Sequence, residues 1–102
     1  MIGVTVLGST GSIGVNTLDV IERHSDRYQV VALSANRNVG RMLEQCLKFS
    51  PKYAVMADEQ AAEDLANKLR EKGSDCEVQW GVDGLIHIAA LAEVEAVMAA
   101  IV

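Results

Sequence analysis

Residues 4–21 read VTVLGSTGSIGVNTLDVI, an apolar run followed by glycines at positions 8, 11 and 14 and then by a segment with helical periodicity. A helix that begins directly after a parallel strand aims its unpaired N–H groups and its positive dipole end beyond the carboxyl edge of the sheet. That place suits a phosphate group. The stretch therefore predicts a strand, a glycine turn and a helix that together form a nucleotide site.

Each glycine has a separate expected role. Gly8 allows a tight turn out of the strand, Gly11 lets a pyrophosphate approach the backbone, and Gly14 lets the helix pack closely on the sheet. Thr10 and Ser12 add hydroxyl groups, although Ser12 also fits as the helix N-cap. The spacing is GxxGxxG, not the GxGxxG of many NAD enzymes, and a turn required only for packing is the alternative.

The second crossover, VVALSANRNVG at residues 30–40, bears on which nucleotide binds. NAD sites usually place an acidic residue after the second strand, whereas a 2'-phosphate requires a cation there. Here Arg37 stands between Asn36 and Asn38, and its planar fork of donors suits a phosphate. The loop favours NADP. In the alternative interpretation Arg37 is a solvated loop residue and Asn38 only caps the next helix.

Short apolar runs alternate with segments whose apolar residues recur every three or four positions. The expected strands are Ile2 to Leu7, Tyr28 to Ser34, Tyr53 to Ala57, Cys76 to Trp80 and roughly Ala96 to Ile101. Alternating strands and helices predict right-handed crossovers and a sheet covered on both faces. The expected fold is a single α/β domain with a doubly wound, Rossmann-like parallel sheet in three layers.

Residues that typically begin or end helices stand between the expected elements and agree with this order. Ser50-Pro51 is expected to end the second helix and Lys72-Gly73 the third, while Asp58 and Glu59 are expected to begin the third helix. The tail, LAEVEAVMAAIV at residues 91–102, has the periodicity of one helix and also supplies a fifth strand. Local sequence leaves these two interpretations of the tail open.

Composition limits the classes of partner. The net charge is -5 over 102 residues with no basic block, which argues against nucleic acid and against a membrane surface as partners. No apolar run approaches the length of a membrane span and no signal-peptide pattern opens the chain, so a cytoplasmic location is expected. Cys46 and Cys76 show no metal-ligand spacing or disulfide framework, and both are expected to be small buried residues.

Four stretches together resemble the NADPH-binding domain of the 1-deoxy-D-xylulose 5-phosphate reductoisomerase family. They are VTVLGSTGSIGVNTLDVI, VVALSANRNV, CLKFSPKYAVM and VEAVMAAIV, and the resemblance covers essentially the whole chain. It implies that the last stretch is the fifth strand. It also implies an enzyme that rearranges 1-deoxy-D-xylulose 5-phosphate and reduces the product with NADPH to 2-C-methyl-D-erythritol 4-phosphate.

The resemblance also implies roles for individual residues. Thr10, Gly11, Ser12 and Ile13 would contact the phosphates and the nearby parts of the cofactor. Asn36, Arg37 and Asn38 would lie at the adenosine 2'-phosphate. Many family members have glycine at position 36 and lysine at position 37, so this chain keeps the cation and adds a side chain.

The family's catalytic residues and its Mg or Mn ligands are expected outside this chain, as is the site for the sugar-phosphate substrate. The 102-residue chain alone is therefore expected to be inactive and to bind NADPH weakly. A monomer is expected for the fragment and a homodimer for the full-length enzyme.

Two rival functions use the same fold. The dinucleotide domain of a semialdehyde dehydrogenase-like reductase would continue into a domain with a nucleophilic cysteine. A non-catalytic NADP-binding module would bind the cofactor tightly without a further domain, since fold does not fix function.

Overall fold

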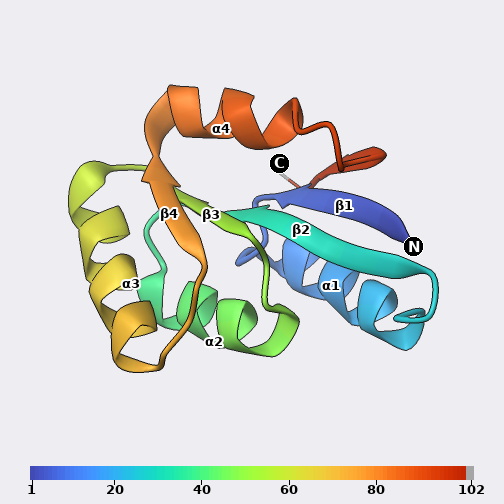
Figure 1. The fold of residues 1–102 in the computed structure, drawn as a ribbon, viewed down its shortest axis with the longest axis horizontal. Coiled ribbons are helices and arrows are strands. Elements are labelled where there is room, and N and C mark those ends of the chain that lie inside the picture. The colour runs from blue at the N-terminus through green and yellow to red at the C-terminus, as the bar shows by residue number, and fades with distance from the viewer. Residues whose placement is uncertain (101–102) are drawn as a thin grey trace.

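The computed structural model describes residues 1–100, which form one parallel sheet flanked by helices (Figure 1). The elements alternate along the chain in the order β1 (Ile2–Leu7), α1 (Ser12–Arg23), β2 (Tyr28–Ser34), α2 (Val39–Phe49), β3 (Tyr53–Met56), α3 (Glu59–Glu71), β4 (Glu77–Trp80), α4 (Gly81–Ala89), β5 (Ala96–Ala99). The expected alternation of strands and helices is confirmed. Ile101, the last residue of the expected fifth strand, lies outside the described residues.

The sheet has the strand order β4-β3-β2-β1-β5, and its neighbouring strands run parallel. The chain moves outward from β1 to β4 and then returns to place β5 on the other side of β1. Helices α1, α2 and α3 cover one face, and α4 crosses the other face (Figure 1). This arrangement confirms the doubly wound, three-layer fold, and its strand order reverses at β1, where such sheets bind ligands beyond the strand ends.

The central strands are buried because helices cover both of their faces. Val4, Val6 and Leu33 have no exposed surface and form the middle of the core. The edge strands β4 and β5 are only partly buried. One polar group in the core has a structural partner, since the Thr5 hydroxyl donates to the Ile88 carbonyl at 2.9 Å and thereby ties β1 to α4.

The expected ends of the helices are confirmed. Ser50 ends α2 in a left-handed conformation, with φ of +49°, directly before Pro51. Asp58 caps α3 by accepting the Ala61 N–H at 2.8 Å. Gly73 follows α3 with φ of +74°, a conformation that favours glycine.

The tail forms a strand and not a continuation of a helix. Residues Val4 to Leu7 of β1 pair in parallel with Ala96 to Ala99 of β5. A hydrogen bond from Glu95 N to Gly3 O, 2.9 Å long, aligns the two strands at their start. Pairing with β1 therefore decides between the two interpretations that local sequence left open.

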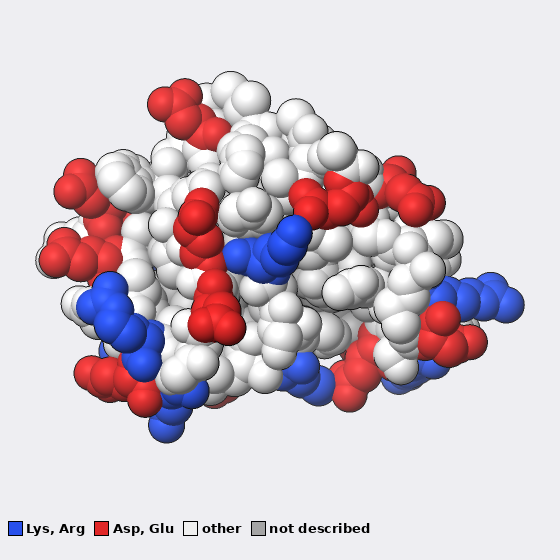
Figure 2. Space-filling model, viewed as in Figure 1, with Lys and Arg blue, Asp and Glu red and all other residues white. Residues whose placement is uncertain are grey.

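Charges of both signs are interspersed over the face seen in Figure 2. Within residues 1–100, no helix combines the length and the apolar character that crossing a membrane requires. Both cysteines are free thiols. Cys46 is buried as expected. The same expectation for Cys76 is wrong in degree, because Cys76 lies directly before the edge strand β4 and is only partly covered.

Candidate nucleotide site

The turn after β1 is tight and is bonded to the end of β2. Gly8 has a φ of +79°, which residues with side chains rarely adopt. Its N–H lies 3.0 Å from the Ser34 carbonyl oxygen and 3.1 Å from the Ser34 hydroxyl, and the Ser9 N–H donates to the same carbonyl at 2.8 Å. The expected role of Gly8 in the turn is confirmed, and the turn is held against the neighbouring strand.

Gly14 lies where α1 passes closest to this turn. A Cβ on Gly14 would be 2.6 Å from the Cα of Ser9 and still closer to the carbonyl oxygen of Gly8. Real Cβ atoms do not approach main-chain atoms so closely. The close approach expected at Gly14 is thus observed, but its partner is the turn at the carboxyl end of β1 and not, as was expected, the sheet itself.

The N-terminus of α1 faces the same region without a side-chain cap. The helix begins at Ser12 and its N-cap is Gly11, so the alternative interpretation of Ser12 as the N-cap is wrong. The physical reason is that the extended residue before the first helical turn is Gly11, with φ of −74° and ψ of 171°. Within residues 1–100 no side chain accepts the cap hydrogen bond, and the first helical bond runs from Val15 N to Gly11 O.

A cleft of about 530 Å³ opens beside this turn at the carboxyl edge of the sheet. Six of the predicted cofactor residues line it: Gly8, Thr10, Gly11, Ser12, Ile13 and Asn36. A Cβ on Gly11 would meet only the Gly8 carbonyl oxygen, at 3.9 Å, so the space beside Gly11 is open. The cleft thus places the main chain of the glycine turn beside a space that a ligand could occupy.

The other lining residues were not predicted from the sequence. They come from the ends of β2, β3 and β5 and from α4: Ser34, Ala35, Met56, Ala57, Leu85 and Ala100. Most of these are apolar, so this part of the cleft suits a flat ring more than a charged group. A sequence signal for some of them existed, because residues directly after parallel strands gather at one edge of the sheet.

The loop after β2 contributes residues to two neighbouring cavities. Asn36 lines the cleft, and its carbonyl accepts the Ala57 N–H at 3.0 Å. Arg37 lines an adjacent, more open cavity of about 580 Å³ beside α3. Its Nε lies 3.2 Å from Asp58 Oδ2, and 78% of its side chain is exposed. The structure therefore places Arg37 next to the cleft and not inside it.

Asn38 has a structural role that the sequence analysis left open. Its Oδ1 accepts the Arg41 N–H at 3.1 Å, which makes Asn38 the N-cap of α2. The cap uses only the oxygen of the side-chain amide. The amide nitrogen is not needed for the cap, so capping does not exclude a contact with a ligand.

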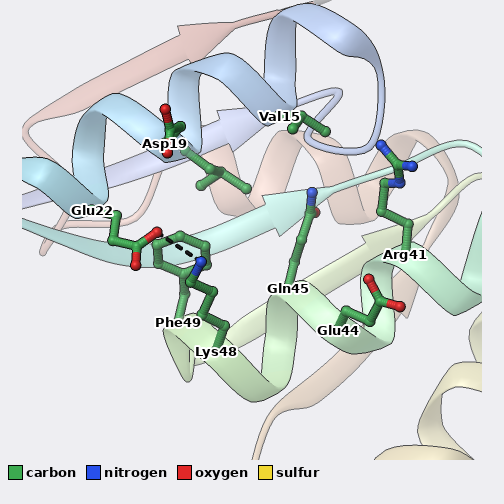
Figure 3. Close-up of a pocket in the computed structure, with 9 residues that line it drawn as sticks. Val15, Asp19, Glu22, Arg41, Glu44, Gln45, Lys48 and Phe49 are labelled. Carbon is green, nitrogen blue, oxygen red and sulfur yellow. Dashed lines mark ion pairs between the residues drawn. The ribbon is translucent and has the colours of Figure 1, made fainter.

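A separate groove of about 300 Å³ lies between α1 and α2 and contains none of the predicted cofactor residues (Figure 3). Val15, Leu18 and Phe49 form its apolar part, and the Lys48–Glu22 ion pair of 2.7 Å crosses it. Gln45 projects from α2 into this groove. The mixed charges of the groove do not form an anion site like that expected for a dinucleotide.

No cluster of three or more His, Cys, Asp or Glu residues within positions 1–100 has the arrangement to hold a metal ion. The residues whose pKa is shifted lie away from the cleft, and Lys52 and Glu93 are two of them. A hydrogen bond with Glu93 raises the pKa of Lys52, and the same contact lowers the pKa of Glu93. These two residues form an ion pair of 2.8 Å that connects the loop before β3 to the loop before β5.

Comparison with known proteins gives a consistent result. The sequence model of the family described as 1-deoxy-D-xylulose 5-phosphate reductoisomerase matches residues 4–102. The reductoisomerase of Nitrosospira multiformis is 58% identical over 99 residues, which are 97% of this chain and 25% of that protein. The enzyme of the same name from Nitrosomonas europaea is 57% identical, covering 97% of this chain and 24% of the relative. The chain therefore spans about a quarter of the length of these relatives.

Solved structures agree. The reductoisomerase from Zymomonas mobilis in complex with NADPH has a TM-score of 0.82 and 47% identity, over 90% of this chain and 24% of that one. A DOX-P reductoisomerase in complex with NADPH, fosmidomycin and magnesium has a TM-score of 0.91 and 32% identity, over 95% of this chain and 24% of that one.

Proposed function

The chain belongs to the 1-deoxy-D-xylulose 5-phosphate reductoisomerase family, and from that premise we propose that residues 1–102 are the NADPH-binding domain of such an enzyme. One observation carries this proposal. The glycine turn and the loop with Arg37 lie side by side at the carboxyl ends of β1 and β2, next to the point between β1 and β5 where the strand order reverses. Neither the semialdehyde dehydrogenase-like rival nor the non-catalytic module is favoured by the family match.

The pyrophosphate would lie at the glycine turn. The uncapped N-terminus of α1 offers main-chain N–H groups and the positive end of the helix dipole. Thr10, Gly11, Ser12 and Ile13 line the cleft there, and the open space at Gly11 lets a ligand approach the backbone. These residues would bind and orient the cofactor and would not take part in the chemical step.

The adenosine 2'-phosphate would lie at Arg37. The guanidinium is exposed beside the cleft, and Asn36 and Asn38 flank it. A planar fork of donors binds a phosphate bidentately, whereas the unphosphorylated ribose of NADH gives the fork nothing equivalent. NADPH is therefore the proposed cofactor.

The proposed reaction of the whole enzyme is the rearrangement of 1-deoxy-D-xylulose 5-phosphate and reduction by NADPH to 2-C-methyl-D-erythritol 4-phosphate. NADPH would supply the hydride, and Mg or Mn would hold oxygen atoms of the substrate. We assign no catalytic residue and no metal ligand to this chain. A cytoplasmic location, a homodimeric whole enzyme and a monomeric 102-residue chain complete the proposal.

Calorimetric titration of the chain with NADPH and with NADH tests the assignment. The expected result is weak binding with a preference for NADPH, and Arg37→Ala should remove that preference. Arg41→Ala is the matched control, because Arg41 is also a cation of this part of the chain but lines the groove between α1 and α2. An equal loss of NADPH binding in both variants would contradict a specific role for Arg37.

A second assay tests the proposal that this chain binds the cofactor but does not carry the catalytic residues. The purified 102-residue chain should show no turnover of 1-deoxy-D-xylulose 5-phosphate with NADPH and Mg²⁺. Turnover by this chain would contradict the proposal that the catalytic and metal-binding residues lie elsewhere.

A further inference from the structure

Gln45 is a buried polar residue for which the proposed function has no role so far. It lies on the inner face of α2 between Met42 and Cys46, and only 8% of its surface is exposed. Burying an amide costs free energy unless the amide makes hydrogen bonds, and an apolar side chain at this position would avoid that cost. The amide of Gln45 therefore needs hydrogen-bond partners, and it finds them in the glycine turn.

The Gln45 amide makes two hydrogen bonds to one residue of that turn. Its Oε1 accepts the Ser9 hydroxyl at 2.7 Å, and its Nε2 donates to the Ser9 carbonyl oxygen at 2.8 Å. Ser9 itself is fully buried, and its N–H is bonded to Ser34 O at 2.8 Å. The side chain and both main-chain polar groups of Ser9 are thus held from two elements, β2 and α2.

These bonds fix the direction of a neighbouring N–H group. In a trans peptide the carbonyl of one residue and the N–H of the next point in opposite directions. Because Gln45 holds the Ser9 carbonyl, the Thr10 N–H must point away from α2. Thr10 lines the cleft. Gln45 instead lines the groove between α1 and α2 (Figure 3).

The same helix also carries the other end of the proposed site. α2 begins directly after Arg37 and is capped by Asn38, and Gln45 lies two turns further along it. Through Gln45, the helix that places the guanidinium also holds the turn proposed for the pyrophosphate. A shift of α2 would therefore move both anion sites together.

We propose that Gln45 is a positioning residue for the cofactor, which fixes the glycine turn in the conformation that receives the pyrophosphate. This inference rests on the proposed NADPH function. It assigns to Gln45 no contact with the cofactor itself. Its effect reaches the ligand through Ser9 and the peptide between Ser9 and Thr10.

The test is binding of NADPH and NADH to the whole protein, with any further domains it carries, in the unaltered form and in Gln45→Met. Methionine has a similar volume and lacks the amide. Both dinucleotides should bind about tenfold more weakly, by the same factor, because the pyrophosphate is common to both. Arg37→Ala should instead weaken NADPH alone. Under saturating NADPH, kcat should stay unchanged while KM for NADPH rises.

Two further variants separate positioning from stability. Cys46→Ala also removes buried contacts of α2, and at a temperature where both variants are folded it should leave both affinities unchanged. Ser9→Ala keeps the bond from Gln45 Nε2 to the Ser9 carbonyl, so it should weaken both dinucleotides only about threefold. If Gln45→Met does not fold, Ser9→Ala with unaltered affinity overturns the inference.

The outcomes distinguish the two proposals. Unaltered binding of both dinucleotides by a folded Gln45→Met would overturn the positioning role while the proposed function stands. A similar loss in Cys46→Ala would also overturn it, because the effect would then follow from α2 packing. If the unaltered protein binds neither dinucleotide, the proposed function fails and the inference fails with it.

Discussion

The Nε atom of Arg37 lies 3.2 Å from Oδ2 of Asp58, while Oδ1 of Asp58 accepts the Ala61 N–H at 2.8 Å. One carboxylate thus caps α3 and also contacts the cation proposed to bind the 2'-phosphate. The cap holds the carboxylate in place, and the ion pair brings together the loops that follow β2 and β3. A phosphate bound by Arg37 would lie close to this negative charge.

We predict that Asp58→Asn tightens NADPH binding about threefold, because a charge of the same sign several ångströms from the phosphate is removed. Asparagine is an equally good N-cap, so the stability of α3 should not change. NADH binding should also be unchanged, since that cofactor has no 2'-phosphate. Titration calorimetry of both cofactors measures the effect.

Asp58→Ala is the matched control for the cap. Alanine removes the charge and also the acceptor for the Ala61 N–H, so it should lower the free energy of unfolding by about 1 kcal/mol. Weaker NADPH binding in Asp58→Asn would mean that Asp58 mainly orients Arg37. That result would contradict the expected tightening of NADPH binding.

Substitution of the glycines should separate packing from ligand access. Gly14→Ala should lower the free energy of unfolding by about 2 kcal/mol or more, because its Cβ collides with the main chain of the turn and not with a flexible side chain. The turn must shift to relieve this contact, so NADPH binding should weaken as well. Urea unfolding and cofactor titration measure the two effects.

Gly11→Ala is the counterpart of that substitution. Its φ of −74° suits alanine and its Cβ would enter open space, so the free energy of unfolding should change by less than about 1 kcal/mol. The added methyl group would lie in the proposed path of the pyrophosphate. NADPH binding should therefore fall with little change in stability, and equal binding by Gly11→Ala and the unaltered chain would contradict a close approach there.

Much of the fold could be predicted because the signals are local. The apolar runs predict β1 and β2 at their observed bounds, and Ser50-Pro51 and Gly73 mark the observed helix ends. The tail could not be decided in this way, since residues 96–99 have both helical periodicity and strand composition. Its strand structure depends on pairing with β1, more than 90 positions earlier in the chain.

In the candidate site, too, the features set by local sequence could be predicted and the long-range contacts could not. The glycine turn is predictable because its residues lie close together in the sequence and each answers a local backbone requirement. The Gln45 contact with Ser9 joins residues 36 positions apart, and the glutamine lies in an ordinary amphipathic pattern. Asp58 could be predicted as the start of α3, but its contact with Arg37 depends on how two crossover loops lie side by side.

The Lys52–Glu93 ion pair should make stability depend on pH. The contact lowers the pKa of Glu93, so its contribution is present above the usual pKa of a glutamate and is lost as the pH falls through the lowered value. It raises the pKa of Lys52, so that contribution is present below the usual pKa of a lysine and is lost as the pH rises through the raised value. The pair should therefore stabilise the fold between about pH 5 and about pH 10.

A double-mutant cycle of Lys52→Met and Glu93→Gln, followed by urea unfolding, measures this coupling. A small favourable coupling is expected at neutral pH and low salt, because both side chains are largely solvated. It should disappear in strong acid and shrink at high salt. A coupling that persists in strong acid would show that the two residues interact through packing and not through charge.

The two cysteines should differ in reactivity although they are neighbours. Hydrogen bonding with Cys76 and burial raise the pKa of Cys46, whereas the same hydrogen bond lowers the pKa of Cys76, which is also more accessible. Since the thiolate is the reactive form, we predict that iodoacetamide modifies Cys76 at least about tenfold faster than Cys46 in the folded protein.

Peptide mass spectrometry over time measures both rates. Labelling in urea is the control, and there the difference in rate should vanish. Equal rates for the two thiols under native conditions would contradict the burial of Cys46 against the core.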